Sequence, residues 1–228
     1  MTYAVKKFNH HNIQTKNKSK SFMTKISKSH YTKGYTKVQY VQKRAIDLLV
    51  GSSLLLVSAP IMLYSIYRIK KESTGSIFFR QSRIGLHGKI FTCYKFRSMH
   101  DNSKFNPYTQ ENDSRIFPFG NTMRKMRIDE LPQLWNIVKG EMHLIGPRAE
   151  WDILVKDYEK IIPHYHDRHV VSPGITGLAQ VSYPYGRNVE DAKKKLAFDR
   201  EYINNWSLWQ EIKVVFKTIE VVLGKKGM

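Results

Sequence analysis

The sequence predicts an α/β fold, mostly helical with one short β-hairpin, of the kind found in monotopic membrane proteins. Three observations support this fold class. Residues 48–67 carry no charged side chain, and residues 76–96 contain two aromatic-rich segments joined by a glycine-containing turn. Residues 151–162, 196–202 and 206–223 are predicted to be helices, the first and last of them with an apolar stripe. We therefore expect a membrane helix followed by a domain with interfacial helices.

The N-terminal part of the chain is strongly basic. The formal net charge is +19, and residues 1–44 contain eleven Lys or Arg residues without one acidic residue. Residues 1–39 are also poor in aliphatic side chains, so we predict a disordered tail that cannot offset its chain entropy by burying apolar area. A flexible basic arm binds polyanions, either nucleic acid or an anionic membrane surface. The apolar segment that follows favours the membrane, and we expect no nucleic-acid partner.

Residues 40–71 form the predicted membrane helix. Its twenty uncharged residues would make a helix ~30 Å long, about the thickness of the hydrocarbon core of a bilayer. Basic residues flank it on both sides, namely Lys43, Arg44, Arg68, Lys70 and Lys71. The positive-inside rule places both ends on the cytoplasmic side, and Pro60 can bend the helix between them. This pattern favours a re-entrant helix hairpin, while a straight transmembrane helix and a buried helix of a soluble protein stay open.

Asp47 is an acidic residue within the first turns of this segment. Lys43 and Arg44 precede it by four and three residues, which is the spacing of neighbours on one helical face. We therefore expect an ion pair within the helix to compensate the charge of Asp47.

Residues 76–81 and 89–96 are predicted to be the two strands of the hairpin, with residues 83–88 as the turn. Lys95 and Arg97 follow at its open end, where basic residues between aromatic ones are also typical of a solvated strand face. Cys93 is the only cysteine, which excludes an intramolecular disulfide and fits a reducing cytosolic compartment. We expect Cys93 to be a core residue.

Asp129 and Glu130 are adjacent carboxylates in the most distinctive stretch of the chain. Leu131, Leu134, Trp135 and Val138 follow with helical spacing, so we expect a helix that begins near Asp129, has Pro132 in its first turn and ends at Gly140. A helix N-terminus favours phosphate, and Arg124, Lys125 and Arg127 lie just upstream. The stretch is either a surface salt-bridge cluster or a site for a phosphorylated substrate with a divalent metal.

The order of these motifs resembles the signature of the bacterial sugar transferases, the monotopic polyprenyl-phosphate hexose-1-phosphate (phosphoglycosyl) transferases. The resemblance extends from about residue 40 to the C-terminus. It rests on residues 43–47, 78–85, 95–99, 124–136, 139–142, 146–148 and 173–181, together with Arg168 and Asp199.

This resemblance implies a transferase that moves a sugar-1-phosphate from a UDP-sugar to polyprenyl phosphate, releases UMP and starts the synthesis of a surface polysaccharide. Asp129 would be the nucleophile that becomes esterified, and Glu130 would hold Mg²⁺. The implied contacts to the phosphates or the nucleotide come from Lys95, Arg97, Arg124 and Arg148, and Asp199 would support this basic site. Residues 72–228 would then be a cytoplasmic catalytic domain at the cytoplasmic membrane, in contact with the lipids of the cytoplasmic leaflet.

Several features leave alternatives open. His143 stands where the family commonly has serine, Ala149 where it has a second proline, and residues 182–185 are an insertion. The histidines of residues 164–169 also permit a zinc site.

A homodimer or a polysaccharide-assembly complex is left open, and the rival functions are a membrane-tethered nucleic-acid-binding protein and a non-catalytic scaffold. The apolar stripe of residues 206–223 fits a membrane interface or core packing equally.

Overall fold

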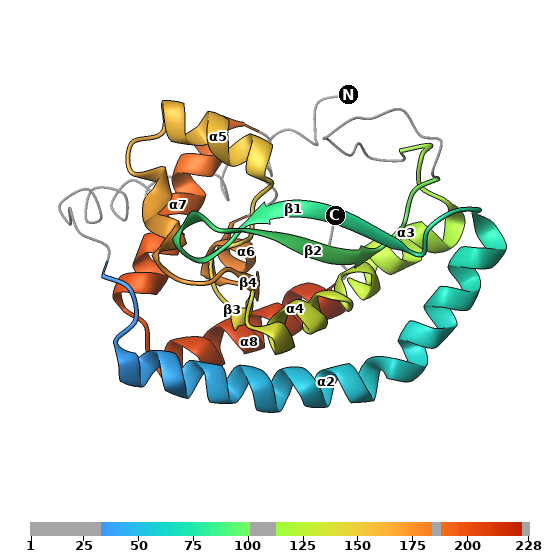
Figure 1. The fold of residues 1–228 in the computed structure, drawn as a ribbon, viewed down its shortest axis with the longest axis horizontal. Helices are drawn as coiled ribbons and strands as arrows, with labels where there is room; N and C mark the ends of the chain where they lie inside the picture. Colours follow the sequence, from blue (N-terminus) through green and yellow to red (C-terminus); the bar gives the residue numbers. More distant parts are fainter. Residues whose placement is uncertain (1–32, 101–112, 184–187, 225–228) are drawn as a thin grey trace, which may run out of the picture.

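The computed structural model describes residues 33–100, 113–183 and 188–224 (Figure 1). The helices are α2 (Lys37–Glu72), α3 (Pro118–Lys125), α4 (Gln133–Lys139), α5 (Asp152–Ile161), α6 (Leu178–Ser182), α7 (Val189–Asn204) and α8 (Leu208–Leu223). The 3-10 helices are η1 (Leu86–Gly88), η2 (Ile128–Glu130) and η3 (Tyr165–Val170). The strands are β1 (Phe78–Ile84), β2 (Ile90–Phe96), β3 (His143–Ile145) and β4 (Gly174–Thr176). The mostly helical fold with a hairpin is confirmed, whereas most of the predicted tail and half of the insertion lie outside the described residues.

Helix α2 is the long apolar helix that the sequence predicts. Thr36 and Gln39 form a capping box at its start, and the helix continues through Pro60 to Glu72. It runs along the lower edge of the molecule and then turns upward (Figure 1). Among the described residues, it is the helix whose length and composition suit a membrane span, and its side chains are largely exposed, Val57 by 78%. The re-entrant path through a membrane stays a prediction.

The N-terminal half of α2 is joined to the domain by buried polar contacts. The Nζ atom of Lys43 lies 2.9 Å from the Glu211 carboxylate, and the guanidinium of Arg44 donates to the carbonyls of Ile137 at 2.5 Å and Val138 at 2.6 Å. The expected ion pair within the helix is therefore wrong. Asp47 instead accepts a hydrogen bond from the Leu144 backbone at 2.9 Å and contacts Nδ1 of His143.

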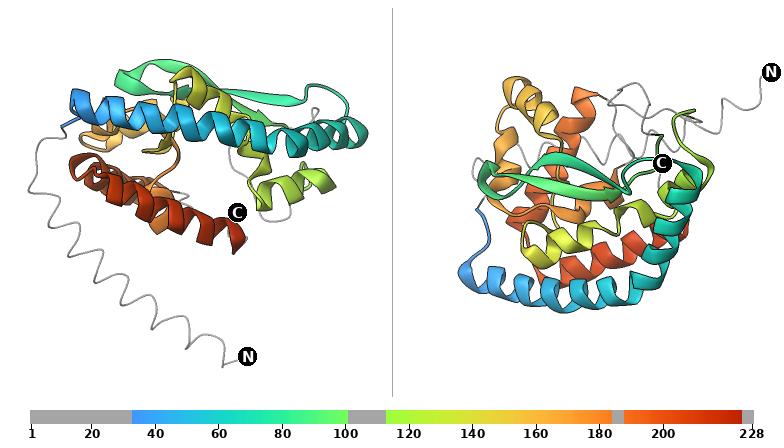
Figure 2. Two further views of the ribbon diagram at one scale, coloured as in Figure 1. Left: turned by 90° about the horizontal axis from the view of Figure 1, so that it is seen from below. Right: turned by 45° about the vertical axis from the view of Figure 1, so that its right-hand side comes forward.

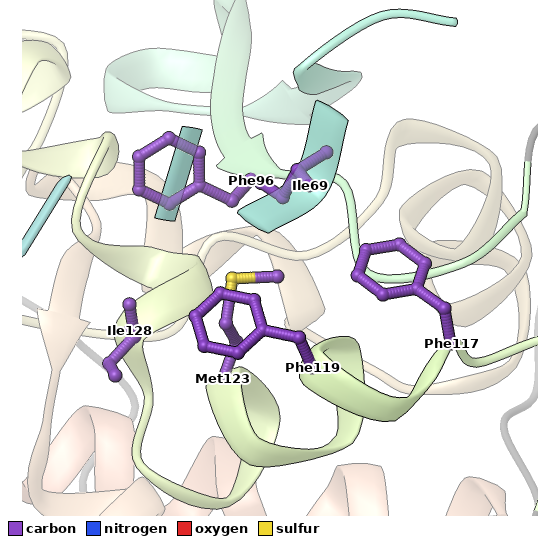
Figure 3. Packing of buried hydrophobic residues seen from close by; sticks show 6 residues of the cluster. All are labelled: Ile69, Phe96, Phe117, Phe119, Met123 and Ile128. Carbon is purple, nitrogen blue, oxygen red and sulfur yellow. The ribbon is translucent and has the colours of Figure 1, made fainter. Parts of the chain in front are cut away.

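The C-terminal half of α2 ends in an apolar cluster. Ile69 is fully buried there between β2 and the helix α3, and the side chains of the cluster face one another (Figure 3). The cluster consists of Ile69, Phe96, Phe117, Phe119, Met123 and Ile128. Because Ile128 opens η2, this packing fixes the start of the segment that carries the two carboxylates.

Strands β1 and β2 form the predicted antiparallel hairpin, with Phe78 opposite Phe96 and Ile84 opposite Ile90. The amide of Asn136 joins the hairpin to α4. Its Nδ2 donates to the Thr92 carbonyl at 2.7 Å, and its Oδ1 accepts from the Tyr94 backbone at 3.2 Å. The hairpin therefore holds the next residue of β2, Lys95, above the segment that leads into α4. As expected, Cys93 is buried.

Strands β3 and β4 form a short parallel pair that the sequence did not reveal. His143 pairs with Gly174 and Ile145 with Thr176, and Arg148 makes an isolated bridge to Gly174. A Cβ atom at Gly174 would lie 2.0 Å from the Gly146 backbone nitrogen, so only glycine allows this close approach. The pair positions Gly146-Pro147-Arg148.

Helix α8 runs beside α2, as the view from below shows (Figure 2). Its Val214 side chain is buried, while most of its other large apolar side chains are exposed. The exposed ones are Leu208, Trp209, Ile212, Val215, Phe216, Ile219 and Leu223. Most of the apolar stripe is therefore not used for core packing, which favours the interfacial interpretation of α8.

Candidate active site

The two carboxylates lie in a 3-10 turn rather than in the first turn of an α-helix. Arg127 has the left-handed backbone conformation at φ 58°, and η2 follows it directly. Helix α4 begins at Gln133, one residue after Pro132, so the predicted start near Asp129 is wrong. Leu131 donates its backbone N–H to the Ile128 carbonyl at 3.2 Å, which closes the tighter turn. Trp135, which has the same helical spacing as Leu131 and Leu134, is 50% exposed.

Glu130 is paired with two cations. Its Oε1 atom lies 2.6 Å from Nζ of Lys95 and 3.6 Å from the guanidinium of Arg127. The side chain is buried, with 8% of the residue exposed. Burial alone would raise its pKa, but Lys95, Arg148 and Arg127 together hold the pKa of Glu130 well below its usual range. Glu130 is thus ionised at neutral pH.

The pKa of Asp129 is shifted in the opposite direction to that of Glu130. It is 9% exposed, and burial raises its pKa, helped by the neighbouring charge of Glu130 and opposed by Lys95, Arg124 and Arg127. Its Oδ1 atom is enclosed and has no hydrogen-bond partner among the described residues. Two adjacent carboxyl groups whose pKa values are pushed apart are suited to different roles in one reaction.

The structure brings three of the predicted cations to this pair. Lys95 contacts Glu130 directly, Arg124 acts on the charge of Asp129, and Arg148 acts on that of Glu130. Lys95 and Arg148 also line a recess beside the pair, together with Gln133 at the start of α4. The arrangement concentrates positive charge around two carboxylates, as a site for a phosphorylated substrate requires.

Arg97 is not brought to the carboxylates by any contact that the described residues show. It is buried and donates to the Ser73 hydroxyl at 3.1 Å, the Ser73 carbonyl at 3.0 Å and the Thr74 carbonyl at 2.5 Å. It lies one residue beyond β2, and its backbone N–H still donates to the Ile77 carbonyl at 2.9 Å, so the hairpin pairing continues to Arg97. These contacts tie β2 to the residues just after α2, so they assign Arg97 to the fold rather than to phosphate binding.

Asp199 reaches the site only through other residues. It lies 2.7 Å from Arg168, whose guanidinium donates to the Arg148 carbonyl at 3.0 Å and to the Tyr165 hydroxyl at 2.6 Å. Burial raises the pKa of Asp199 to about 6, although Arg168 opposes the shift. Arg168, to which the sequence assigned no role, therefore links Asp199 to Arg148, and the supporting role of Asp199 stays a prediction.

The carboxylate pair fits a Mg²⁺ ion by its donor set. Glu130 is ionised, and the enclosed Oδ1 atom of Asp129 lacks a partner among the described residues. Magnesium is commonly held by one or two carboxylates together with substrate phosphate oxygens. Glu130 would hold the ion beside Asp129, and this assignment stays a prediction.

A second group of potential metal ligands lies on η3, away from the carboxylates. Ligand atoms of His164, His166 and Asp167 lie within 4.8 Å of one another. However, the Arg200 guanidinium lies 3.6 Å from the Asp167 carboxylate and competes with a cation there. This group corresponds to the zinc alternative that the histidine spacing left open.

Three residues have contacts at the site that the sequence does not predict. Arg127 contributes an ion pair to Glu130, and Arg83 and Gln133 line the recess beside Lys95 and Arg148. Arg83 stood inside a recognised motif, and Gln133 stood three residues after Glu130. The spacing of isolated polar residues gives no signal of which tertiary recess they enter.

Comparison with known proteins agrees with the motifs and the geometry. A sequence model of the family described as bacterial sugar transferase matches residues 38–225. The chain is 43% identical over 183 residues to the UDP-N-acetylgalactosamine-undecaprenyl-phosphate N-acetylgalactosaminephosphotransferase of Aeromonas hydrophila, covering 79% of this chain and 43% of that protein. It is 38% identical over 186 residues to the UDP-glucose:undecaprenyl-phosphate glucose-1-phosphate transferase of Escherichia coli (strain K12), covering 80% and 40%.

A third relative is similar in length. An uncharacterized sugar transferase of Bacillus subtilis (strain 168) is 38% identical over 192 residues, covering 82% of this chain and 90% of that protein. The chain thus spans less than half the length of the first two relatives and nearly all of the third. Because the family match extends over most of the described residues, including both carboxylates, the chain belongs to the bacterial sugar transferase family.

Proposed function

We propose that this protein is a phosphoglycosyl transferase that moves a sugar-1-phosphate from a UDP-sugar to a polyprenyl phosphate. The observation that carries the proposal is the pairing of ionised Glu130 with the partly desolvated Asp129 under Lys95 and Arg148. The names of the relatives from Aeromonas hydrophila and Escherichia coli, which describe transfer from UDP-sugars to undecaprenyl phosphate, support it.

The proposed reaction has two displacements at one phosphorus atom. An Asp129 carboxylate oxygen bonds to the phosphorus that bears the sugar, and the bond from this phosphorus to the bridging oxygen breaks. UMP leaves with the electron pair of that bond. A phosphate oxygen of the polyprenyl phosphate then bonds to the same phosphorus, and the bond to Asp129 breaks to regenerate the carboxylate.

The surrounding charges suit both displacements. Asp129 must be ionised to attack, and Lys95, Arg124 and Arg127 reduce the cost of ionising it in its buried position. Arg124 and Arg148 would bind phosphate oxygens through paired donors, which lysine cannot supply. A Mg²⁺ ion held by Glu130 would add positive charge next to the diphosphate.

The proposed lipid acceptor gives a reason for the apolar helix α2. A polyprenyl phosphate places its charged head at the bilayer surface, and a UDP-sugar arrives from water. Helix α2 is apolar and largely exposed, and α8 beside it exposes apolar side chains as well. We propose that both lie in the cytoplasmic leaflet of the cytoplasmic membrane, with the carboxylates at head-group level and facing the cytoplasm.

The test is UMP release by the full chain in lipid nanodiscs that contain polyprenyl phosphate, with a panel of UDP-sugars. We expect one or a few donors to release UMP, and Asp129→Asn to abolish the release. Glu130→Gln should slow it and weaken its dependence on Mg²⁺. Exposed Asp157 provides the matched control, because Asp157→Asn should leave the rate unchanged.

The chemical step is tested by trapping. A donor labelled in the sugar, mixed with the protein in the absence of acceptor, should leave label on the acid-quenched wild type and none on Asp129→Asn. UMP release by Asp129→Asn at the wild-type rate would overturn the covalent route. No UMP release by the wild type with any donor would favour a non-catalytic scaffold.

A further inference from the structure

The side chains on the first turn of η3 offer the donor atoms of a transition-metal site. His164, His166 and Asp167 each contribute one ligand atom, and these atoms lie within 4.8 Å of one another. The Nε2 atom of His166 lies 3.4 Å from Oδ1 of Asp167. Two ligands of a tetrahedral Zn²⁺ ion, each about 2.0–2.1 Å from the metal, are about 3.3 Å apart. The His166 and Asp167 atoms therefore already have nearly the separation that the metal requires.

His164 supplies the third ligand from the start of the same turn. It precedes η3 in the left-handed conformation at φ 60°, and its carbonyl accepts the backbone N–H of Asp167 at 3.1 Å. This closed turn brings the three side chains together. The ring centroids of His164 and His166 are 6.2 Å apart, and both residues are exposed. Because exposed rings change rotamer at little cost, both imidazoles can turn toward one ion.

Asp167 is the least mobile member of the cluster. Its side chain is 14% exposed, and the guanidinium of Arg200 from α7 lies 3.6 Å from its Oδ2 atom. Arg200 competes for the charge of Asp167, but it approaches the oxygen that does not face His166. A carboxylate that binds a metal commonly has a second polar partner that orients it. The ion pair with Arg200 can therefore hold Oδ1 of Asp167 toward the two imidazoles.

We propose that His164, His166 and Asp167 bind a Zn²⁺ ion, with water in the fourth position. Two imidazoles and one carboxylate suit Zn²⁺, whereas Mg²⁺ prefers oxygen ligands. The ion would join the first turn of η3 to α7 through the ion pair with Arg200. The same 3-10 helix carries Arg168, which donates to the backbone of the segment after β3 at 3.0 Å, so bound Zn²⁺ would stabilise this part of the domain. The site is separate from the carboxylate pair and does not depend on the proposed function.

The test is the Zn²⁺ affinity of the full chain in nanodiscs, measured by competition with a chromogenic chelator. His164→Asn removes one imidazole, and asparagine is among the residues that tolerate the left-handed conformation. His166→Gln removes the other imidazole at an exposed position. Each should weaken the tightest Zn²⁺ site at least about tenfold, which is already the cost of losing an outer-shell partner of a metal. Zn²⁺ should also raise the unfolding temperature of the wild type but not that of the two variants, because it binds the folded turn.

His87→Asn is the matched control for His164→Asn, because His87 is exposed and also has a left-handed backbone, at φ 52°. This variant removes one of the nine histidines of the chain, yet it should leave the Zn²⁺ affinity and the Zn²⁺-dependent rise in unfolding temperature unchanged. A large excess of Mg²⁺ should not displace the bound Zn²⁺.

Circular dichroism identifies a variant that fails to fold, and the other variant then carries the test. Wild-type Zn²⁺ affinity in a folded His164→Asn or His166→Gln variant would assign the binding to other histidines and overturn the inference. A wild type that binds no Zn²⁺ at micromolar concentrations would overturn it as well. Neither result bears on UMP release with Mg²⁺, which tests the proposed function separately.

Discussion

The Nζ atom of Lys95 lies 2.6 Å from Oε1 of Glu130, and this contact joins the hairpin to the turn that carries both carboxylates. The two side chains are 19% and 10% exposed, so the pair is shielded from solvent. Lys95 has the strongest lowering influence on the pKa of Glu130, and it also opposes the rise of the Asp129 pKa. Lys95 therefore lowers the pKa of both carboxyl groups, together with the nearby arginines.

Replacing Lys95 should destabilise the fold. In Lys95→Met the carboxylate of Glu130 stays buried without its nearest partner, and breaking a buried pair in this way costs about 3 kcal/mol. The depressed pKa of Glu130 contributes stability above its unfolded pKa, and this contribution is lost as the pH falls through the folded pKa. Denaturation at neutral pH should show the loss. Lys89 is exposed and directly precedes β2, so Lys89→Met should cost little stability. Equal stabilities of the two variants would contradict the role assigned to Lys95.

Replacing Asp129 should have the opposite effect on stability. Because burial raises the pKa of Asp129, its neutral form favours the folded state, and this contribution is lost as the pH rises through the folded pKa. Asp129→Asn keeps the shape without the charge, so it should unfold at the same or a higher temperature than the wild type at pH 7.5. The difference should shrink toward pH 4. If Asp129→Asn melts at a clearly lower temperature at pH 7.5 than the exposed control Asp157→Asn, this prediction is contradicted.

Asp199 should give the fold a measurable pH dependence between pH 5 and 7. Its pKa is raised to about 6 in the fold, so Asp199 favours folding most when it is neutral, and this contribution is lost as the pH rises through 6. Between pH 5 and 7 the wild type should lose about 1.4 kcal/mol relative to Asp199→Asn. Urea denaturation at several pH values measures this difference. Glu201→Gln on the same helix keeps Asp199 and is the matched control for removing a carboxylate from α7. Parallel pH profiles of the wild type and Asp199→Asn would exclude the raised pKa.

Pro60 should decide whether the ends of α2 lie on one side of the membrane. Pro60→Leu restores a backbone donor to the helix and should favour a straight crossing. Single cysteines placed in a Cys93→Ala background at Lys33 and Ser76, on either side of α2, can be labelled in intact cells with an impermeant maleimide. With Pro60 present we expect neither site to react, and with Pro60→Leu we expect one of them to react. Reaction of one site in the chain that retains Pro60 would show a spanning helix.

Local patterns in the sequence were sufficient for much of the fold. The hairpin, helices α5 and α8 and the C-terminal half of α7 follow from local patterns, which depend on neighbouring residues only. The pairing of β3 with β4 was not predicted, because each strand has three residues and the partners are far apart in sequence. The 3-10 turn η2 was missed for another reason, since Pro132 fits both the first turn of a helix and the residue just before it.

The sequence predicts which residues form the site better than it predicts what these residues contact. Lys95, Arg124 and Arg148 do gather around Asp129 and Glu130, but Arg97 and Asp47 have partners in distant elements. Sequence spacing reveals only the neighbours three or four residues away, and tertiary packing offers a charge nearer partners. The burial of Asp129 was not predicted either, because local spacing does not show which side chains the tertiary packing encloses.

The attachment of α2 at both of its ends makes the length of this helix a fixed dimension of the protein. Asp47 is tied to the backbone of Leu144 near one end, and Ile69 is enclosed by the apolar cluster near the other, while the residues between them are largely exposed. Adding one residue between these two points would turn everything beyond it by about 100° around the helix axis. One of the two attachments would then face away from its partner. Natural variation in the segment between Asp47 and Ile69 should therefore change side chains freely but not the number of residues.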